Sequence, residues 1–193
     1  SVAQGNTLES LLKFSSHIEN KIIYNGYSHE IGNGELKVIS PNLAALNKLN
    51  NHWQIEEGNK ETDISGSLKE EYKINISDLS KKIFIEDNSI PNGSSIAFLF
   101  SYLGKFFLFL GDSHPSVVLK ELFVLGYTET NKLEVDFVKV SHHASKHNTS
   151  PELMAIIKCE NFIISSNGFF HDLPHKECLS RIITSRNYSR LYF

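Results

Sequence analysis

The chain is poor in the residues that mark several specialised protein classes. Its 193 residues include two cysteines, Cys159 and Cys178, one methionine and one tryptophan. Two cysteines in a chain of this length give no disulfide framework, so a reducing, cytoplasmic setting is the expectation. No apolar run has the length needed to span a bilayer, and no membrane association is expected.

Other absences count against several kinds of binding and catalytic site. The net charge of −3 gives no general attraction to nucleic acid, although a local basic patch stays open. Gly-x-Gly occurs only at Gly32-Asn33-Gly34, in a turn-like stretch without the remainder of a phosphate-binding fingerprint. The Gly-x-Ser-x-Gly motif of a nucleophilic serine is absent, and neither cysteine has a nearby histidine that would indicate a reactive thiolate.

What is present is the pattern of an α/β protein. Strand-like runs alternate with helical patterns in the second half, which predicts one domain over residues 1–193 with a mixed sheet and flanking helices. Strands are expected at 21–27, 35–39, 96–103, 106–110, 135–140, 162–165 and 190–193, and helices at 41–53, 117–125, 175–184 and from Ser150 onward. Residues 54–92 are predicted to form a polar excursion within this domain.

Two aromatic-rich runs form the centre of this pattern. They meet at Gly104-Lys105, which predicts a hairpin turn with glycine supplying a positive φ. Every residue of the second run, 106–110, is apolar, so this strand is expected to be covered on both faces. The run ends in Gly111-Asp112, and a carboxylate there needs a compensating partner. Asp112 or Ser113 could cap the helix that starts near Pro115, or Asp112 could bind a metal ion.

Three strand ends carry polar groups suited to a site. Asp112 follows the first strand, His142 and His143 follow the second, and His171 follows the third, with His175 just beyond it. Loops at one edge of an α/β sheet are where sites assemble, and carboxylate with imidazole is a ligand set for zinc, manganese or iron. The alternative is structural: a buried, hydrogen-bonded histidine in a loop, and surface positions for the others. No partner is visible for His17, His29, His52 and His114.

Several motifs, in order and spacing, carry a family resemblance. They are Leu36-Lys37-Val38-Ile39-Ser40-Pro41, Asn92-Gly93-Ser94-Ser95-Ile96, Phe107-Leu108-Phe109-Leu110-Gly111-Asp112, Val138-Lys139-Val140-Ser141-His142-His143-Ala144-Ser145, and Ile163-Ile164-Ser165-Ser166-Asn167-Gly168 before Pro174-His175. Together they resemble the C-terminal half of a metallo-β-lactamase-fold hydrolase, in the branch of the nuclease-like domain of DNA-uptake competence proteins.

This resemblance implies a specific fold and site. The fold would be part of an αββα sandwich with zinc or manganese, two ions in the complete protein, at the sheet edges. Asp112 would be the bridging carboxylate, and His142, with His143 beside it, a candidate for proton transfer. The last metal histidine of the family falls in the loop that holds His171 and His175, but Leu173 stands where that histidine is expected.

The family's His-x-His-x-Asp-His signature is absent, and the chain begins at Ser1 with Met154 as its only methionine. The expectation is a processed or cut fragment of a metal-dependent hydrolase, acting on phosphodiester or related ester bonds of a nucleic acid or nucleotide. It would be inactive without an N-terminal half, supplied as a partner or replaced by a second copy. The alternative is a non-catalytic binding or oligomerisation module with a degenerate metal site. A third possibility is a complete small α/β domain whose histidines bind nothing.

Overall fold

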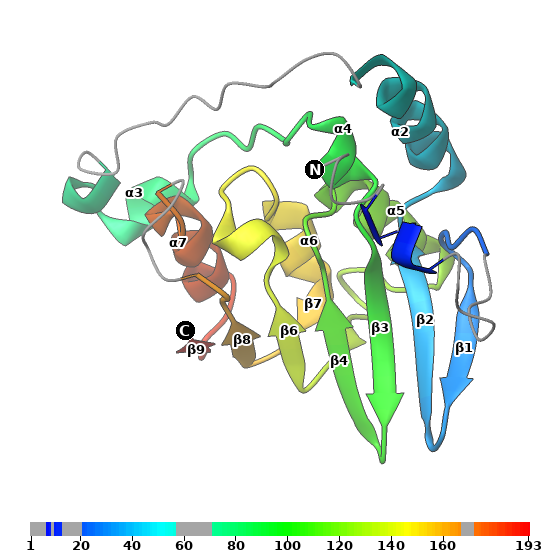
Figure 1. The fold of residues 1–193 in the computed structure, drawn as a ribbon. Coiled ribbons are helices and arrows are strands. Elements are labelled where there is room, and N and C mark those ends of the chain that lie inside the picture. Colours follow the sequence, from blue (N-terminus) through cyan, green and yellow to red (C-terminus); the bar gives the residue numbers. More distant parts are fainter. Residues whose placement is uncertain (1–6, 9, 13–20, 57–70, 167–171) are drawn as a thin grey trace.

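A seven-stranded mixed sheet forms the frame of the structure, a computed structural model that describes residues 7–8, 10–12, 21–56, 71–166 and 172–193 (Figure 1). The strands lie in the order β1-β2-β3-β4-β6-β8-β9. Neighbours are antiparallel from β1 to β4 and parallel from β4 to β9. Their bounds are Ser28–Ile31 (β1), Gly34–Ser40 (β2), Ala97–Tyr102 (β3), Lys105–Phe109 (β4), Phe137–Lys139 (β6), Asn161–Ile163 (β8) and Arg190–Tyr192 (β9).

The remaining elements pack around this sheet. A small parallel pair joins β5 (Leu133–Glu134) to β7 (Ile157–Lys158). The helices are α2 (Leu43–Glu56), α3 (Ile76–Ser80), α4 (Ile90–Gly93), α5 (Pro115–Val124), α6 (Pro151–Ile156) and α7 (Lys176–Thr184), with short 3₁₀ segments at Glu71–Lys73 and Ser141–Ala144. In the described part of the chain, no helix combines the length and apolar character needed to cross a membrane. The predicted α/β class with a mixed sheet and flanking helices is confirmed.

One face of the sheet forms the core with α5, α6 and α7, and α5 and α6 lie behind the strands in Figure 1. Alternate residues of neighbouring strands point to this face, and Leu108, Val138 and Phe162 are fully buried there. Val118 and Leu122 of α5 and Ile182 of α7 belong to the same cluster. Burial of these side chains supplies the main stabilising term of the fold.

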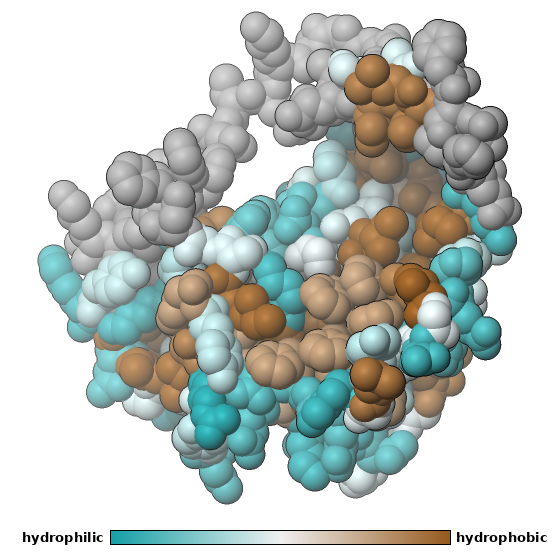
Figure 2. Space-filling view, turned by 60° about the horizontal axis from the view of Figure 1, so that its bottom comes forward, coloured by the Kyte–Doolittle hydropathy of each residue, from teal (hydrophilic) through white to brown (hydrophobic). Residues whose placement is uncertain are grey.

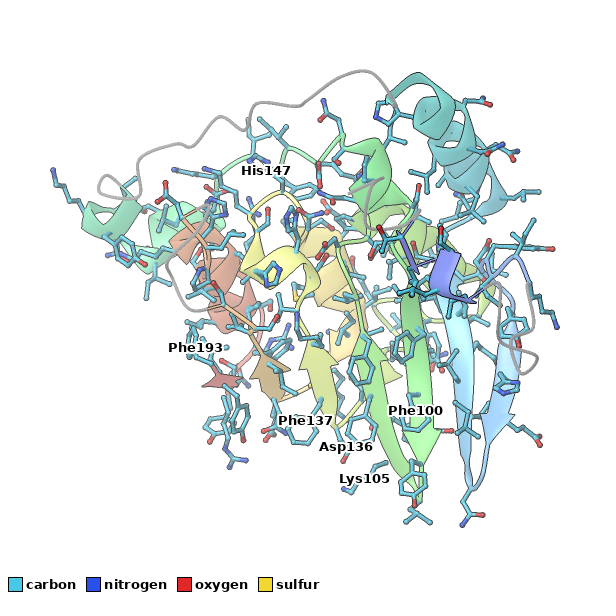
Figure 3. All side chains as sticks on the ribbon, viewed as in Figure 1. Phe100, Lys105, Asp136, Phe137, His147 and Phe193 are labelled. Carbon is cyan, nitrogen blue, oxygen red and sulfur yellow. The ribbon has the colours of Figure 1, made fainter. Side chains whose placement is uncertain are left out.

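The other face carries a row of aromatic rings, and we call it the open face. Phe98 stacks on Phe109 with ring centroids 4.8 Å apart, and Phe107 contacts both Phe100 at 6.2 Å and Phe137 at 6.0 Å. Figure 3 shows Phe100 and Phe137 on the side of the strands that faces the viewer. In Figure 2, brown and tan side chains gather across the centre of the surface that is turned forward.

The β3–β4 hairpin corrects two predictions. The turn residues are Leu103 and Gly104, with φ of 48° and 75°, and Lys105 pairs with Tyr102 as the first residue of β4. The predicted turn was therefore one residue late. Helices cover β4 on one face, because α5, α6 and α7 lie on the side of Leu108, whereas Phe107 stays half-buried on the open face. In the described part of the chain, the expected cover of this strand is therefore complete around Leu108 and only partial on the open face.

The N-terminal part of the sheet also differs from the prediction. Residues 21–27 form no strand, and β1 occupies Ser28–Ile31, in the connection between the strands predicted at 21–27 and 35–39. All four β1 residues are exposed, so they have no apolar alternation that could reveal a strand. Ser40 belongs to β2, and the side chain of Asn42 accepts the Ala45 N–H at 2.8 Å at the start of α2.

The predicted excursion over residues 54–92 is partly ordered into the fold. Residues 54–56 belong to the end of α2 and not to an excursion. Within residues 71–92, Leu79 of α3 is fully buried and Asn75 caps α3 by accepting the Ser77 N–H. Lys176 of α7 donates to the carbonyl of Ile74 at 2.7 Å. These contacts attach the segment to α7. Residues 57–70 lie outside the described residues.

Candidate functional site

The carboxyl ends of β4 and β6 bring two of the predicted site segments together. The His142 N–H donates to the Gly111 carbonyl at 2.8 Å, and the Asn148 side-chain amide donates to the Asp112 carbonyl at 3.1 Å. Because β4 and β6 are parallel neighbours, the loops that follow them lie at one edge of the sheet. His147, from the same loop, lies beyond the upper ends of the strands in Figure 3. Asp112 and His142 therefore belong to one site.

The loop that follows β6 has an unusual backbone. His142, His143 and Ala144 all have left-handed conformations, with φ of 42°, 52° and 66°. Residues other than glycine seldom adopt such angles, and conformations of this kind persist only when surrounding contacts fix them. Ala144 is fully buried, and its carbonyl accepts the His175 N–H at 3.1 Å. Strained backbone of this type is concentrated at functional sites, which makes this loop the strongest candidate in the chain.

The His142 imidazole lies in a network of three polar side chains. Its Nδ1 is 3.1 Å from Asn148 Oδ1 and 3.8 Å from Asp87 Oδ2. Asp87 Oδ2 accepts hydrogen bonds from Asn92 at 2.7 Å and from Asn148 at 3.1 Å. Asp87 and Asn92 come from the segment before α4 and from α4, so two stretches far apart in the sequence meet at one imidazole.

The hydrogen bonds that the Asp87 carboxyl accepts favour its ionised form. Burial alone would raise its pKa, but hydrogen bonds from Asn92, the Ser89 backbone and Asn148 outweigh burial and lower the pKa below its ordinary value. The positive charge of His114, when protonated, acts in the same direction. The Asp87 side chain next to His142 is therefore an ionised carboxylate at neutral pH.

Asp112 is not the cap of α5. The residue at the cap position is His114, without a side-chain bond, and the Glu86 carboxylate accepts the Ser116 N–H at 2.7 Å instead. The Asp112 N–H donates to Ser95 Oγ at 2.9 Å. Burial lowers the pKa of Lys139, and the negative charge of Asp112 opposes that shift. The capping interpretation of Asp112 was wrong.

The other predicted residues surround the same loop. The His143 ring is exposed, and its Nδ1 contacts the carbonyl of Ser165, beyond the end of β8. His175 precedes α7, and its Nδ1 accepts the Lys146 N–H at 3.2 Å. The rings of His175 and His147 lie 6.4 Å apart, edge to face. His171 lies outside the described residues. The structure thus places Asp112, His142, His143 and His175 around one loop.

Three residues of this site were missed by the sequence prediction. Asp87 lies in a polar stretch where nothing distinguishes it from its neighbours, and Asn148 follows the histidines among small polar residues. Asn92 was quoted only as part of a motif. His114, for which no partner was expected, packs against Gly93: a Cβ added to Gly93 would lie 2.7 Å from the ring carbon Cε1. Contacts over such sequence separations leave no local signal.

A metal ion needs several convergent ligands. Among the described residues, no group of three or more His, Cys, Asp or Glu side chains is arranged to hold one. The predicted ligands Asp112 and His175 therefore do not by themselves fit a zinc or manganese centre, because such centres use at least three protein ligands. Comparison with protein-family models, with curated proteins and with solved structures finds no match to this chain.

Proposed function

We propose that this chain supplies the acid–base half of a hydrolase of the metallo-β-lactamase type, with a phosphodiester or related ester as substrate. The observation that supports it is the His142 imidazole, bound to an Asn148–Asp87 network on a strained loop beside Asp112. A fixed imidazole backed by an ionised carboxylate is suited to proton transfer. The substrate class comes from the sequence resemblance alone.

The roles of the residues follow from their positions. His142 transfers a proton to or from the reacting oxygen, and Asp112 places a negative charge at the same sheet edge. The resemblance implies zinc or manganese, but the described residues lack a complete ligand set, and a second half of the sandwich would have to complete it.

Hydrolysis of bis(p-nitrophenyl) phosphate tests this proposal. The assay compares the natural polypeptide that contains this chain with its His142→Ala variant, in buffers with added zinc or manganese. We expect the variant to lose activity by about 10²–10⁴-fold, the usual contribution of general acid–base catalysis. His29→Ala is the matched control, because His29 is an exposed histidine of β1. Absence of hydrolysis, or equal loss in both variants, would overturn the proposal.

Metal content of the same samples is a separate measurement. Near-stoichiometric zinc or manganese that falls in Asp112→Ala, but not in His29→Ala, is expected if Asp112 is a ligand in the completed site. Equal metal content in all three proteins would remove Asp112 from the ligand set. It would leave the proton-transfer role of His142 to the hydrolysis assay.

The open face supports a second candidate, a binding or oligomerisation module. Contiguous apolar surface on a soluble protein usually marks a contact with a partner. Phe98, Phe100, Phe107 and Phe109 all belong to this face, whereas Phe106 points to the opposite side, next to Asp136. A second sheet packed here, from another copy or from an N-terminal half of the same fold, would complete a two-sheet sandwich.

Light scattering separates these partners. If a second copy covers the open face, the purified chain is dimeric, and Phe107→Glu converts it to a monomer. Phe106→Glu is the matched control, since it places the same charge on the neighbouring residue of β4 but on the other face. A monomeric wild-type chain would exclude the second copy, and a dimer equally sensitive to both substitutions would exclude the open face as its contact.

A further inference from the structure

We propose that Asn148 and Asp87 are positioning residues that hold neutral His142 as the tautomer with its proton on Nδ1. Nε2 is then the ring nitrogen left to accept a proton. This inference rests on the proposed function for its purpose, but its physical argument depends only on the hydrogen bonds around His142.

The hydrogen-bond partners of the Asn148 amide allow it only one orientation. Its Nδ2 lies 3.1 Å from Asp87 Oδ2 and 3.1 Å from the Asp112 carbonyl oxygen. Both of these partners can only accept hydrogen bonds, so the amide group that faces them must be the NH₂ and not the oxygen. Asn148 is also almost completely buried, which leaves its side chain no alternative partner in water.

The orientation of Asn148 determines which ring nitrogen of His142 carries the proton. With its NH₂ directed at Asp87 and Asp112, Asn148 presents Oδ1 to His142 Nδ1 at 3.1 Å. An amide oxygen is an acceptor, so Nδ1 must carry a hydrogen. In neutral imidazole only one nitrogen is protonated, and Nε2 then has the free lone pair.

Asn92 makes the only competing contact at Nδ1 among the described residues. Its Nδ2 is 3.4 Å from His142 Nδ1 but 2.7 Å from Asp87 Oδ2. The short bond to a carboxylate is the stronger of the two, because charge-assisted hydrogen bonds exceed neutral ones. Asn92 therefore donates to Asp87, and the Asn148 oxygen determines the state of Nδ1.

Asp87 holds the network in this arrangement. Oδ2 accepts from both amides, and Oδ1 accepts the Ser89 N–H at 2.8 Å. An amide in place of this carboxylate would direct an NH₂ at a donor whichever way it turned. We therefore expect Asn148 to lose its fixed orientation in Asp87→Asn, so that it no longer holds the proton of His142 on Nδ1.

The tautomers are measured by long-range ¹H–¹⁵N correlation spectra of ¹⁵N-histidine-labelled chain at alkaline pH, where imidazoles are neutral. His142→Gln assigns the His142 signals. In the wild type, we expect the Nδ1–H pattern for His142. In Asn148→Ala and in Asp87→Asn, we expect the major form to change to Nε2–H, the tautomer that histidine favours in water.

His175 provides an internal control. Its Nδ1 accepts the Lys146 N–H at 3.2 Å, so it must be the opposite tautomer, with the proton on Nε2, in every variant. Glu86→Gln is the matched control variant, an acid-to-amide change at a carboxylate that binds Ser116 and not the His142 network. It should leave the His142 pattern unchanged.

Two results would overturn the inference: wild-type His142 with its proton on Nε2, or an unchanged Nδ1–H pattern in a folded Asp87→Asn variant. If Asn148→Ala does not fold, the Asp87→Asn result decides. The expected tautomers together with absent phosphodiester hydrolysis would support the positioning network and reject the proposed function, so the two failures can be told apart.

Discussion

The loop that carries His142 is attached to α7 by a buried arginine, and this attachment is open to a quantitative test. Arg181 is 3% exposed. One guanidinium nitrogen donates to the carbonyls of Lys146 and Thr149, at 2.6 and 3.2 Å, and another pairs with Glu177 one turn earlier in the helix. The guanidinium also lies over the Phe84 ring, 5.2 Å from its centroid. Arg181 thus connects the loop, α7 and the segment before α4.

We predict that Arg181→Met lowers the free energy of unfolding by about 3 kcal/mol. Removing one partner of a buried pair costs about 3–5 kcal/mol, because the other charge is left without compensation. The lower value applies because Lys82 Nζ lies 3.6 Å from Glu177 Oε2 and retains part of the compensation. For a chain of this size the loss corresponds to a fall of roughly 6–12 °C in Tm.

Urea unfolding followed by circular dichroism measures this loss. The series comprises Arg181→Met, Glu177→Gln and the double variant, with Arg190→Met as the control for an exposed arginine of β9. The double variant should lose about 1–3 kcal/mol less than the sum of the single losses, because it contains no unpaired buried charge. The control should stay within about 0.5 kcal/mol of the wild type. A loss below about 1 kcal/mol in Arg181→Met, or strict additivity, would refute the reasoning.

Three further outcomes are expected. Burial raises the pKa of Cys178 to about 12 and that of Cys159 above its ordinary value, so neither thiol should react with Ellman's reagent until urea unfolds the chain; a rapid native reaction would contradict this. Gly111→Ala should cost about 1–3 kcal/mol in urea unfolding, because φ is +53° and the new Cβ would lie 2.6 Å from the Ile96 carbonyl oxygen; unchanged stability would refute it. The pKa of Asp87 is lowered from its ordinary value of 3.8, so its ionisation stabilises the fold at pH values above 3.8, and this contribution is lost as the pH falls toward the lowered native pKa. Asp87→Asn should therefore lose less stability than the wild type on acidification. Equal acid dependence of the two proteins would count against this.

Local sequence patterns predicted the elements that have strong local signals. The Ser150-Pro151 start of α6 is confirmed, with Ser150 Oγ accepting the Leu153 N–H at 3.1 Å. The apolar strands β4 and β6 and the amphipathic helices α5 and α7 lie where the pattern placed them, within a few residues. Each of these signals depends on residues close to one another in the chain, so it can be recognised without knowledge of the tertiary fold.

The site was predicted in part for the same reason. Asp112, His142, His143 and His175 follow strands or precede a helix, and parallel strands bring such positions to one edge. His171 shares this pattern, but its position lies outside the described residues. The functional roles of all five stay predictions, since sequence position alone does not fix what a side chain contacts.

The sequence by itself determined the α/β class, the order of its main elements and the edge at which the histidines gather, because these follow from periodicity and strand direction. Tertiary structure alone decided which face of the sheet packs against α5, α6 and α7, that Glu86 and not Asp112 accepts a hydrogen bond from the start of α5, and that Asp87 lies next to His142. Those contacts join residues that are far apart in the chain: Asp87 and Asn148, for example, meet only when the segment before α4 packs on the loop after β6. Their energy comes from burial and hydrogen-bond geometry, which exist only once the chain has folded.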